Sequence, residues 1–133
     1  MPNQLILLSR SLKKSMPNES FIYFGDTAHL PYGNKSKASV IQYSLNIANF
    51  LFTQQVKAIV VACNTASAVA LEELNKQYSI PVLNVVDPSV LKALSHSKSK
   101  TIVVIGTETT ILSGTYQKKI NNINKEHRYK YGI

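Results

Sequence analysis

The chain has 133 residues, of which 44% are hydrophobic, and 15 Lys and Arg against seven Asp and Glu give a formal net charge of +8. This length allows one domain, or one domain and part of another, with a buried core. No run of about 18 apolar residues could span a bilayer and no leader pattern opens the chain, so we expect no membrane association and a cytoplasmic location. The single cysteine excludes an internal disulfide, and no Cys/His spacing fits a metal site such as zinc.

The basic side chains are dispersed along the sequence. A nucleic-acid site usually concentrates them on one face or interleaves them with stacking aromatic rings, and neither arrangement is visible here. We therefore expect a solvated basic surface and no nucleic-acid partner.

Helical and strand-like patterns alternate along the chain. The predicted elements in chain order are a helix over 4–15, a strand over 21–24, a helix over 36–54, a strand over 57–62, a helix over 65–78, a strand over 81–86, a helix over 88–95, a strand over 101–106 and a helix over 108–122. Ser36 is expected to cap the second helix, and Asp87 before Pro88 the fourth. This alternation predicts an α/β fold, a parallel sheet with helices on both faces as in Rossmann-like and flavodoxin-like domains.

The ends of the chain fit this fold less well. It opens on a helix where such sheets open on a strand, and the segment 95–100 reads as a linker before one more strand and helix. We therefore predict a first domain over 1–96 that lacks its first strand. We expect residues 97–133 to hold the first strand and helix of a second α/β domain, followed by a basic tail.

Parallel sheets bind ligands beyond the carboxyl ends of their strands, which directs attention to the loops at 25–33, 63–65 and 106–110. Cys63 lies where a strand ends and a helix begins, a position that favours a thiolate and can hold an anion. Asn64 and Thr65 add donors beside it. The alternative is a small buried apolar residue, because free cysteine is often buried. The residue pattern leaves both readings open.

Three kinds of thiol chemistry can be compared at Cys63. A cysteine phosphatase needs an arginine about six residues on, where this chain has Val69. A papain-like hydrolase needs a histidine base, and His29 is the best placed candidate. Proton transfer needs neither, so it fits best. The other loops have ordinary alternatives: turn chemistry for Pro31–Gly33, and helix capping for Thr107 and Thr110.

Four segments together resemble bacterial glutamate racemases. They are "FIYFGDTAHLPYGNKS" at 21–36, "AIVVACNTASAVALEEL" at 58–74, "IPVLNVVDPS" at 80–89 and "IGTETTILSGTY" at 105–116. They occur in the order and approximate spacing of that family. The wider superfamily includes aspartate and hydantoin racemases, but the PYG and CNTASA segments favour the glutamate enzymes.

The resemblance implies a cofactor-independent isomerase that interconverts L- and D-glutamate for peptidoglycan synthesis, with a homodimer as in the family. In that family two cysteines on opposite faces of the substrate remove and return the α-proton. The resemblance implies that Cys63 is one of these two cysteines. It also implies that Asn64 and Thr65 bind the carboxylate or ammonium groups of the substrate. The side-chain end of the substrate is expected to contact Pro31, Tyr32 and Gly33. Thr107 and Thr110 are expected nearby.

Two family segments have no counterpart here. The Asp-Ser-Gly loop of the family precedes the matched region, the Cys-Thr-His segment with the second cysteine follows it, and "EHRYKYGI" matches nothing in the family. We therefore expect a racemase truncated at both ends and poorly active alone. The alternatives are a non-catalytic remnant or binding protein of the same fold, and a related enzyme such as an aspartate racemase.

Overall fold

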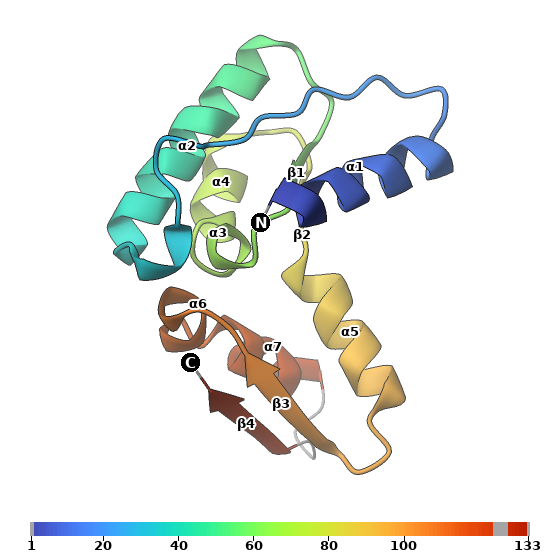
Figure 1. Ribbon diagram of the computed structural model, residues 1–133, viewed down its shortest axis with the longest axis vertical. Coiled ribbons are helices and arrows are strands. Elements are labelled where there is room, and N and C mark those ends of the chain that lie inside the picture. The colour runs from blue at the N-terminus through green and yellow to red at the C-terminus, as the bar shows by residue number, and fades with distance from the viewer. Residues whose placement is uncertain (1, 124–127, 133) are drawn as a thin grey trace.

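The chain forms two lobes, each containing a pair of parallel strands (Figure 1). The computed structural model describes residues 2–123 and 128–132, with side chains for residues 7–123 and 130–132. The first lobe contains α1 (Pro2–Ser15), the 3₁₀ turn η1 (Tyr32–Asn34), α2 (Lys37–Thr53), β1 (Ile59–Val61), α3 (Asn64–Val69), α4 (Leu71–Gln77) and β2 (Val82–Asn84). The second lobe contains α5 (Val86–His96), β3 (Thr101–Ile105), α6 (Glu108–Leu112), α7 (Thr115–Ile123) and β4 (Arg128–Gly132).

Both sheets are parallel, which confirms the predicted α/β class. In the first, β1 pairs with β2 so that Ile59 lies opposite Val82. In the second, β3 pairs with β4 along five positions. Among the described residues the four strands form two separate sheets rather than one continuous sheet.

Helix α2 forms for the reasons that its sequence predicts. The Ser36 side chain accepts a hydrogen bond from the Ser39 amide at 3.1 Å, so it caps the helix as expected. Val40 and Ala48, two turns apart, are both buried on the face toward the strands and helices of the first lobe. The cap and the apolar stripe together orient the helix over this lobe.

Each lobe has its own hydrophobic core. The first lobe contains two clusters, one of Ala48, Ile59, Ala70, Leu74, Tyr78 and Val82 and one of Tyr32, Val40, Ala66 and Val69. The second lobe contains a cluster of Val86, Val90, Val104, Ile111 and Ile120. Helix α5 therefore shares its core with the strand and helices that follow it. The domain boundary between residues 96 and 97 stays a prediction.

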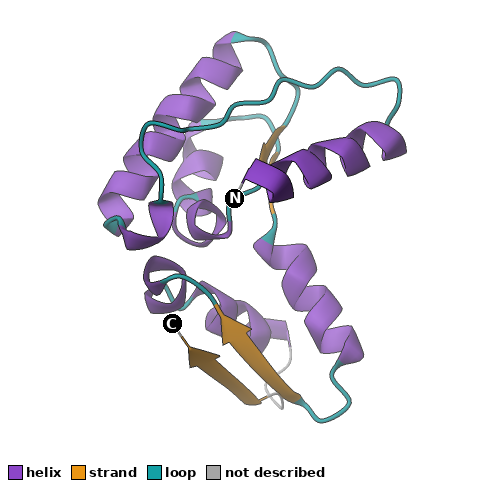
Figure 2. Cartoon of the chain, viewed as in Figure 1, coloured by secondary structure: helices purple, strands orange, loops and turns teal. Residues whose placement is uncertain are grey.

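The predicted strand at 21–24 is wrong. Residues 16–31 form the long loop that Figure 2 shows between α1 and η1. Phe21 and Tyr23 are exposed, at 41% and 58%. A strand needs a neighbour for its backbone hydrogen bonds, and in the described part of the chain none pairs with this segment.

Two predicted helices are each divided in two. The helix expected over 65–78 breaks at Ala70, between α3 and α4, and the helix expected over 108–122 breaks between α6 and α7. Gly114 lies in the second break with φ +66°, a left-handed conformation that glycine adopts without strain. The apolar side chains of Ala66, Val69, Ala70, Leu74 and Tyr78 are nevertheless buried.

The start of α5 differs from its prediction. The helix begins two residues before Pro88, at Val86. The Asn84 side-chain oxygen accepts hydrogen bonds from the amides of Val86 and Asp87, both at 2.9 Å. Asn84 therefore satisfies the free amides of this helix, and the predicted cap by Asp87 is wrong.

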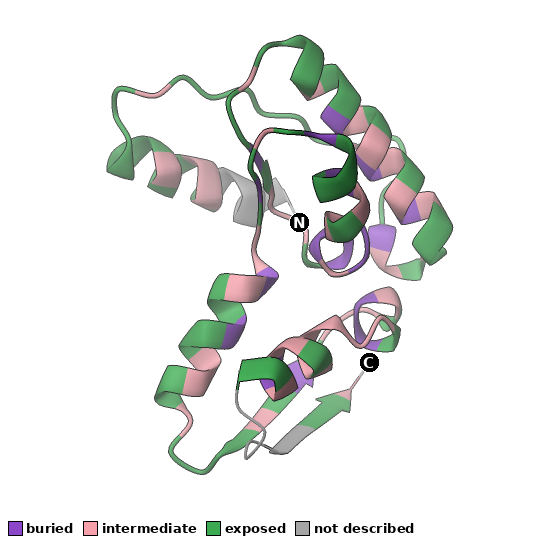
Figure 3. Ribbon diagram, turned by 180° about the vertical axis from the view of Figure 1, so that it is seen from behind, coloured by how far each residue is buried: buried purple, intermediate pink, exposed green. Residues whose placement is uncertain are grey.

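The C-terminal tail contributes a strand that its sequence did not predict. Residues 128–132 form β4, while residues 124–127 and 133 lie outside the described residues. Along β3, Val104 faces the core, whereas Val103 and Ile105 are 61% and 83% exposed. Figure 3 shows the buried and exposed stretches of the ribbon. Among the described residues, helices thus pack on one face of this sheet, and the exposed side chains of β3 lie on the other. No helix within the described residues has the length and apolar character that crossing a membrane requires.

Candidate active site

The cysteine lies where the first sheet gives way to a helix. Cys63 follows β1 closely and occupies the N-cap of α3, with an extended backbone (φ −86°, ψ 124°). Its carbonyl oxygen accepts a hydrogen bond from the Ser67 amide at 2.8 Å, which closes the first turn of α3. The free thiol is half-buried and packs against the cluster that contains Tyr32 and Val69. The predicted strand-to-helix position of this residue is confirmed.

Three threonines from two distant segments meet beside Cys63. We call Thr65, Thr107 and Thr110 the threonine cluster. The Thr65 and Thr107 hydroxyl oxygens are 3.0 Å apart, those of Thr107 and Thr110 are 2.9 Å apart, and Thr110 donates to Thr65 at 3.1 Å. Thr65 and Thr110 are buried, at 4% and 3% exposure. Because a buried hydroxyl needs a partner, these mutual hydrogen bonds join α3 to the start of α6.

A second set of polar side chains lies on the segment 25–35, which we call the tyrosine loop. The Tyr32 hydroxyl donates to Asp26 Oδ2 at 2.6 Å, and His29 Nδ1 lies 2.8 Å from Asp26 Oδ1. Burial raises the pKa of Tyr32 well above its usual value, and its bond to the Asp26 carboxylate raises it further. Burial also acts to raise the pKa of Asp26, but hydrogen bonds from Tyr32 and His29 outweigh it, so that pKa is lowered. Tyr32 thus keeps its proton while Asp26 stays ionised at neutral pH.

The tyrosine loop rests directly on α6. The Thr109 hydroxyl lies within hydrogen-bond distance of two loop carbonyls, those of Gly33 at 3.0 Å and Lys35 at 2.8 Å. A Cβ atom added at Gly33 would lie 2.4 Å from Thr107 Cγ2, closer than real Cβ contacts allow. Gly33 is therefore required for this close approach, which brings the loop against the threonine cluster.

Seven of the eight predicted site residues come together. Tyr32 and Cys63 share a cluster, Gly33 touches Thr107, and the threonine cluster holds the segments 63–65 and 107–110 side by side. Asn64 is exposed and accepts a hydrogen bond from Tyr116 on α7 at 2.7 Å. Pro31 is also exposed and occupies the N-cap position of η1. The functional roles of all eight residues stay predictions.

Sequence reasoning missed three residues that organise the site. Asp26, Thr109 and Tyr116 hold Tyr32, the tyrosine loop and Asn64 respectively. The motif segments 21–36 and 105–116 contain all three, which was the available signal. Their partners could not be read from the sequence, since two of the three contacts join residues at least 52 positions apart.

The thiol-hydrolase alternative gains no support from the position of His29. Its Nδ1 atom pairs with Asp26, and its ring stacks on Tyr43 with 4.0 Å between centroids. No hydrogen bond joins His29 to Cys63 among the side chains that the structure describes. In the same part of the chain no group of His, Cys, Asp and Glu is arranged to hold a metal ion.

The family model for Asp/Glu/hydantoin racemases matches residues 6–131. The chain belongs to this family. The matched span extends into the C-terminal tail, and the expectation that this tail is foreign to the family stays a prediction.

The curated relatives of this chain are glutamate racemases. A glutamate racemase of Geobacter metallireducens is 50% identical over 117 residues, which cover 88% of this chain and 43% of that protein. A glutamate racemase of Aquifex aeolicus is 47% identical over 117 residues, or 88% of this chain and 46% of its own length. The chain therefore spans less than half the length of the curated relatives it matches.

Solved structures show the same relationship. A glutamate racemase from Bacillus anthracis superposes with a TM-score of 0.91 at 34% identity, covering 96% of this chain and 48% of that one. A glutamate racemase from Francisella tularensis in complex with D-glutamate gives 0.86 at 37% identity, covering 93% and 46%. The parallel strands and helices described above are thus the fold of this part of the family.

Proposed function

We propose that this chain carries half of a glutamate racemase site, in which Cys63 moves the α-proton of glutamate without a cofactor. The observation that carries the proposal is the convergence of the tyrosine loop and the threonine cluster on this thiol. The relatives named above are glutamate racemases, and one of the similar structures holds D-glutamate.

The residues around the thiol suit the two ends of an amino acid. We assign Asn64 and Thr65 to its carboxylate or ammonium group, and Tyr32 and Gly33, with Pro31, to its side-chain carboxylate. Thr107 and Thr110 hold Thr65 in place from the second lobe. Fixed donors around both carboxylates lower the free energy of the carbanionic transition state, because they need not reorganise as charge develops.

The chemistry needs a proton donor on each face of the α-carbon. The printed sequence has one cysteine, so we expect this polypeptide alone to invert glutamate slowly. In the cell we assign the activity to the cytoplasm, where the product D-glutamate supplies peptidoglycan synthesis, and we retain the homodimer as part of this proposal.

A single thiol can still be tested by its half-reaction. The Cys63 thiolate would take the α-proton, exchange it with D₂O and return a deuteron to the same face. We expect proton NMR to show loss of the α-proton signal from one glutamate enantiomer faster than formation of the other enantiomer. Cys63→Ser, with an unchanged unfolding midpoint, should stop the exchange.

Three other outcomes separate the alternatives. If glutamate is inverted as fast as its α-proton exchanges, and Cys63→Ser abolishes both, the proposal that this chain carries only half of the site is contradicted. Exchange of aspartate rather than glutamate would indicate the related racemase. Glutamate that protects Cys63 from alkylation without any exchange would support a binding protein of the same fold.

A further inference from the structure

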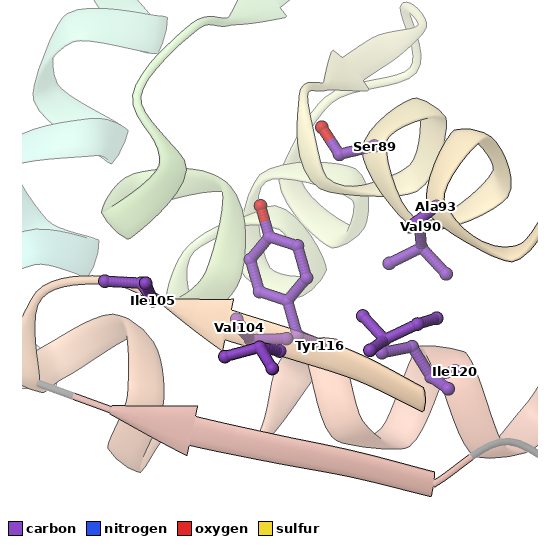
Figure 4. A pocket seen from close by; sticks show the side chains of 9 residues that line it. Ser89, Val90, Ala93, Val104, Ile105, Tyr116 and Ile120 are labelled. Atoms are coloured by element: carbon purple, nitrogen blue, oxygen red, sulfur yellow. The ribbon is translucent and has the colours of Figure 1, made fainter. Parts of the chain in front are cut away.

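Tyr116 joins the second lobe to the segment that follows the thiol. It lies on α7, where its ring packs against the apolar cluster of Val86, Val90, Val104, Ile111 and Ile120. Figure 4 shows the ring rising from α7 beside a pocket of ≈ 230 Å³, with its hydroxyl pointing away from β3. That hydroxyl donates a hydrogen bond to Asn64 Oδ1 at 2.7 Å, across 52 positions of sequence.

The bond matters because the Asn64 amide has two chemically opposite ends. Its oxygen accepts hydrogen bonds and its nitrogen donates two. When Oδ1 is held by the tyrosine, Nδ2 is turned the other way, and among the described side chains it has no hydrogen-bond partner. In the flipped orientation the oxygen would face an approaching anion and repel it.

We propose that Tyr116 is a positioning residue for the carboxylate site, which it serves by fixing the Asn64 amide with its nitrogen toward the ligand. The inference rests on the proposed function, because that function supplies the carboxylate. Tyr116 acts on the substrate site only through Asn64 in this scheme and takes no part in proton transfer.

The surroundings make Tyr116 suited to this role. The neighbouring Thr115 hydroxyl donates to the Ala68 carbonyl of α3 at 2.6 Å, which anchors the start of α7 on the helix that begins with Asn64. Burial raises the pKa of the Tyr116 phenol, so it stays a protonated donor at neutral pH. Thr65 is held by Thr107 and Thr110 in the same way. Hydroxyls of segment 107–116 thus fix both residues that follow Cys63.

The test measures how D-glutamate protects Cys63 from iodoacetamide in the full chain. We expect Tyr116→Phe, which keeps the packed ring, to raise the half-protecting concentration about fivefold, the effect of one lost neutral hydrogen bond. Asn64→Ala should raise it too, and adding Tyr116→Phe to Asn64→Ala should have no further effect. Tyr78→Phe is the matched control, since its hydroxyl donates to the Leu45 carbonyl at 3.3 Å, away from Asn64.

A second readout needs no ligand. The side-chain amide signals of Asn64 in a ¹⁵N spectrum should shift in Tyr116→Phe and stay unchanged in Tyr78→Phe. Normal protection in Tyr116→Phe, or additive losses in the double variant, would overturn the positioning role. If D-glutamate does not protect even the wild-type thiol, the proposed function fails, and the carboxylate role falls with it whatever the amide signals show.

Discussion

The tyrosine loop and the threonine cluster lie beside the same cysteine but are held by different kinds of contact. Tyr32 and His29 bind Asp26 across six and three positions of sequence, and His29 is largely exposed. The threonine cluster joins residues 42 and 45 positions apart, and its members Thr65 and Thr110 are buried. The first set can form within its own segment, whereas the second exists only when the two lobes are docked. Losses of stability should therefore be smaller for contacts made within the loop than for contacts that join the two lobes.

The largest effect is expected where the two regions touch. Gly33→Ala places a methyl group 2.4 Å from Thr107 Cγ2, so the loop or the threonine must move. We expect the free energy of unfolding to fall by about 1–3 kcal/mol, the usual cost of overpacking. Urea unfolding measures it.

Gly25→Ala is the control for that variant. Its added methyl group would meet only the hydroxyl end of the exposed Tyr23 side chain, at 3.0 Å. Equal stability of the two alanine variants would show that the loop does not rest tightly on α6.

A smaller effect is expected inside the threonine cluster. Thr110→Val keeps the shape of the buried side chain but removes the hydroxyl that pairs with Thr65 and Thr107. The two remaining hydroxyls still have each other, so we expect a loss of about 1–2 kcal/mol in urea unfolding. Thr53→Val removes an exposed hydroxyl and should cost under about 0.5 kcal/mol. If Thr110→Val and Thr53→Val lower the free energy of unfolding by the same amount, the buried hydroxyls of the threonine cluster stabilise the fold no more than an exposed one.

The smallest effect is expected for the hydrogen bonds that Asp26 makes within the tyrosine loop, and it depends on pH. The pKa of Asp26 is lowered from 3.8 in the folded chain, so its charge stabilises the fold above pH 3.8, and this contribution is lost as the pH falls through the folded value. Asp26→Asn should cost less than about 1 kcal/mol at pH 6. The difference from wild type should vanish toward low pH in urea titrations, and a difference independent of pH would exclude the charge as its cause.

The sequence predicted local features well. The Ser36 cap and the position of Cys63 follow from residues within a few positions of each other. Hydrophobic spacing also gave the α/β class, because alternating strands and helices leave few other arrangements. The segments around the thiol were found because each is a recognisable motif. The structure shows that these segments lie against one another.

Features that depend on distant partners were not predictable in this way. Residues 21–24 read as a strand but pair with no strand in the part of the chain that the structure describes, whereas the polar tail pairs with β3. Asn84 replaced Asp87 as the residue that binds the first amides of α5, since its side chain reaches them from the end of β2. The Tyr116 bond to Asn64 depends on docking of the lobes, which no local pattern encodes.

The packing of α5 has a consequence for limited proteolysis. Val86 and Val90 on this helix are covered by the core of the second lobe, and the exposed Lys98 follows in the turn before β3. Trypsin cutting after Lys98 would therefore not release two intact lobes. It would leave an N-terminal fragment whose last helix presents a bare apolar face, a species prone to aggregate.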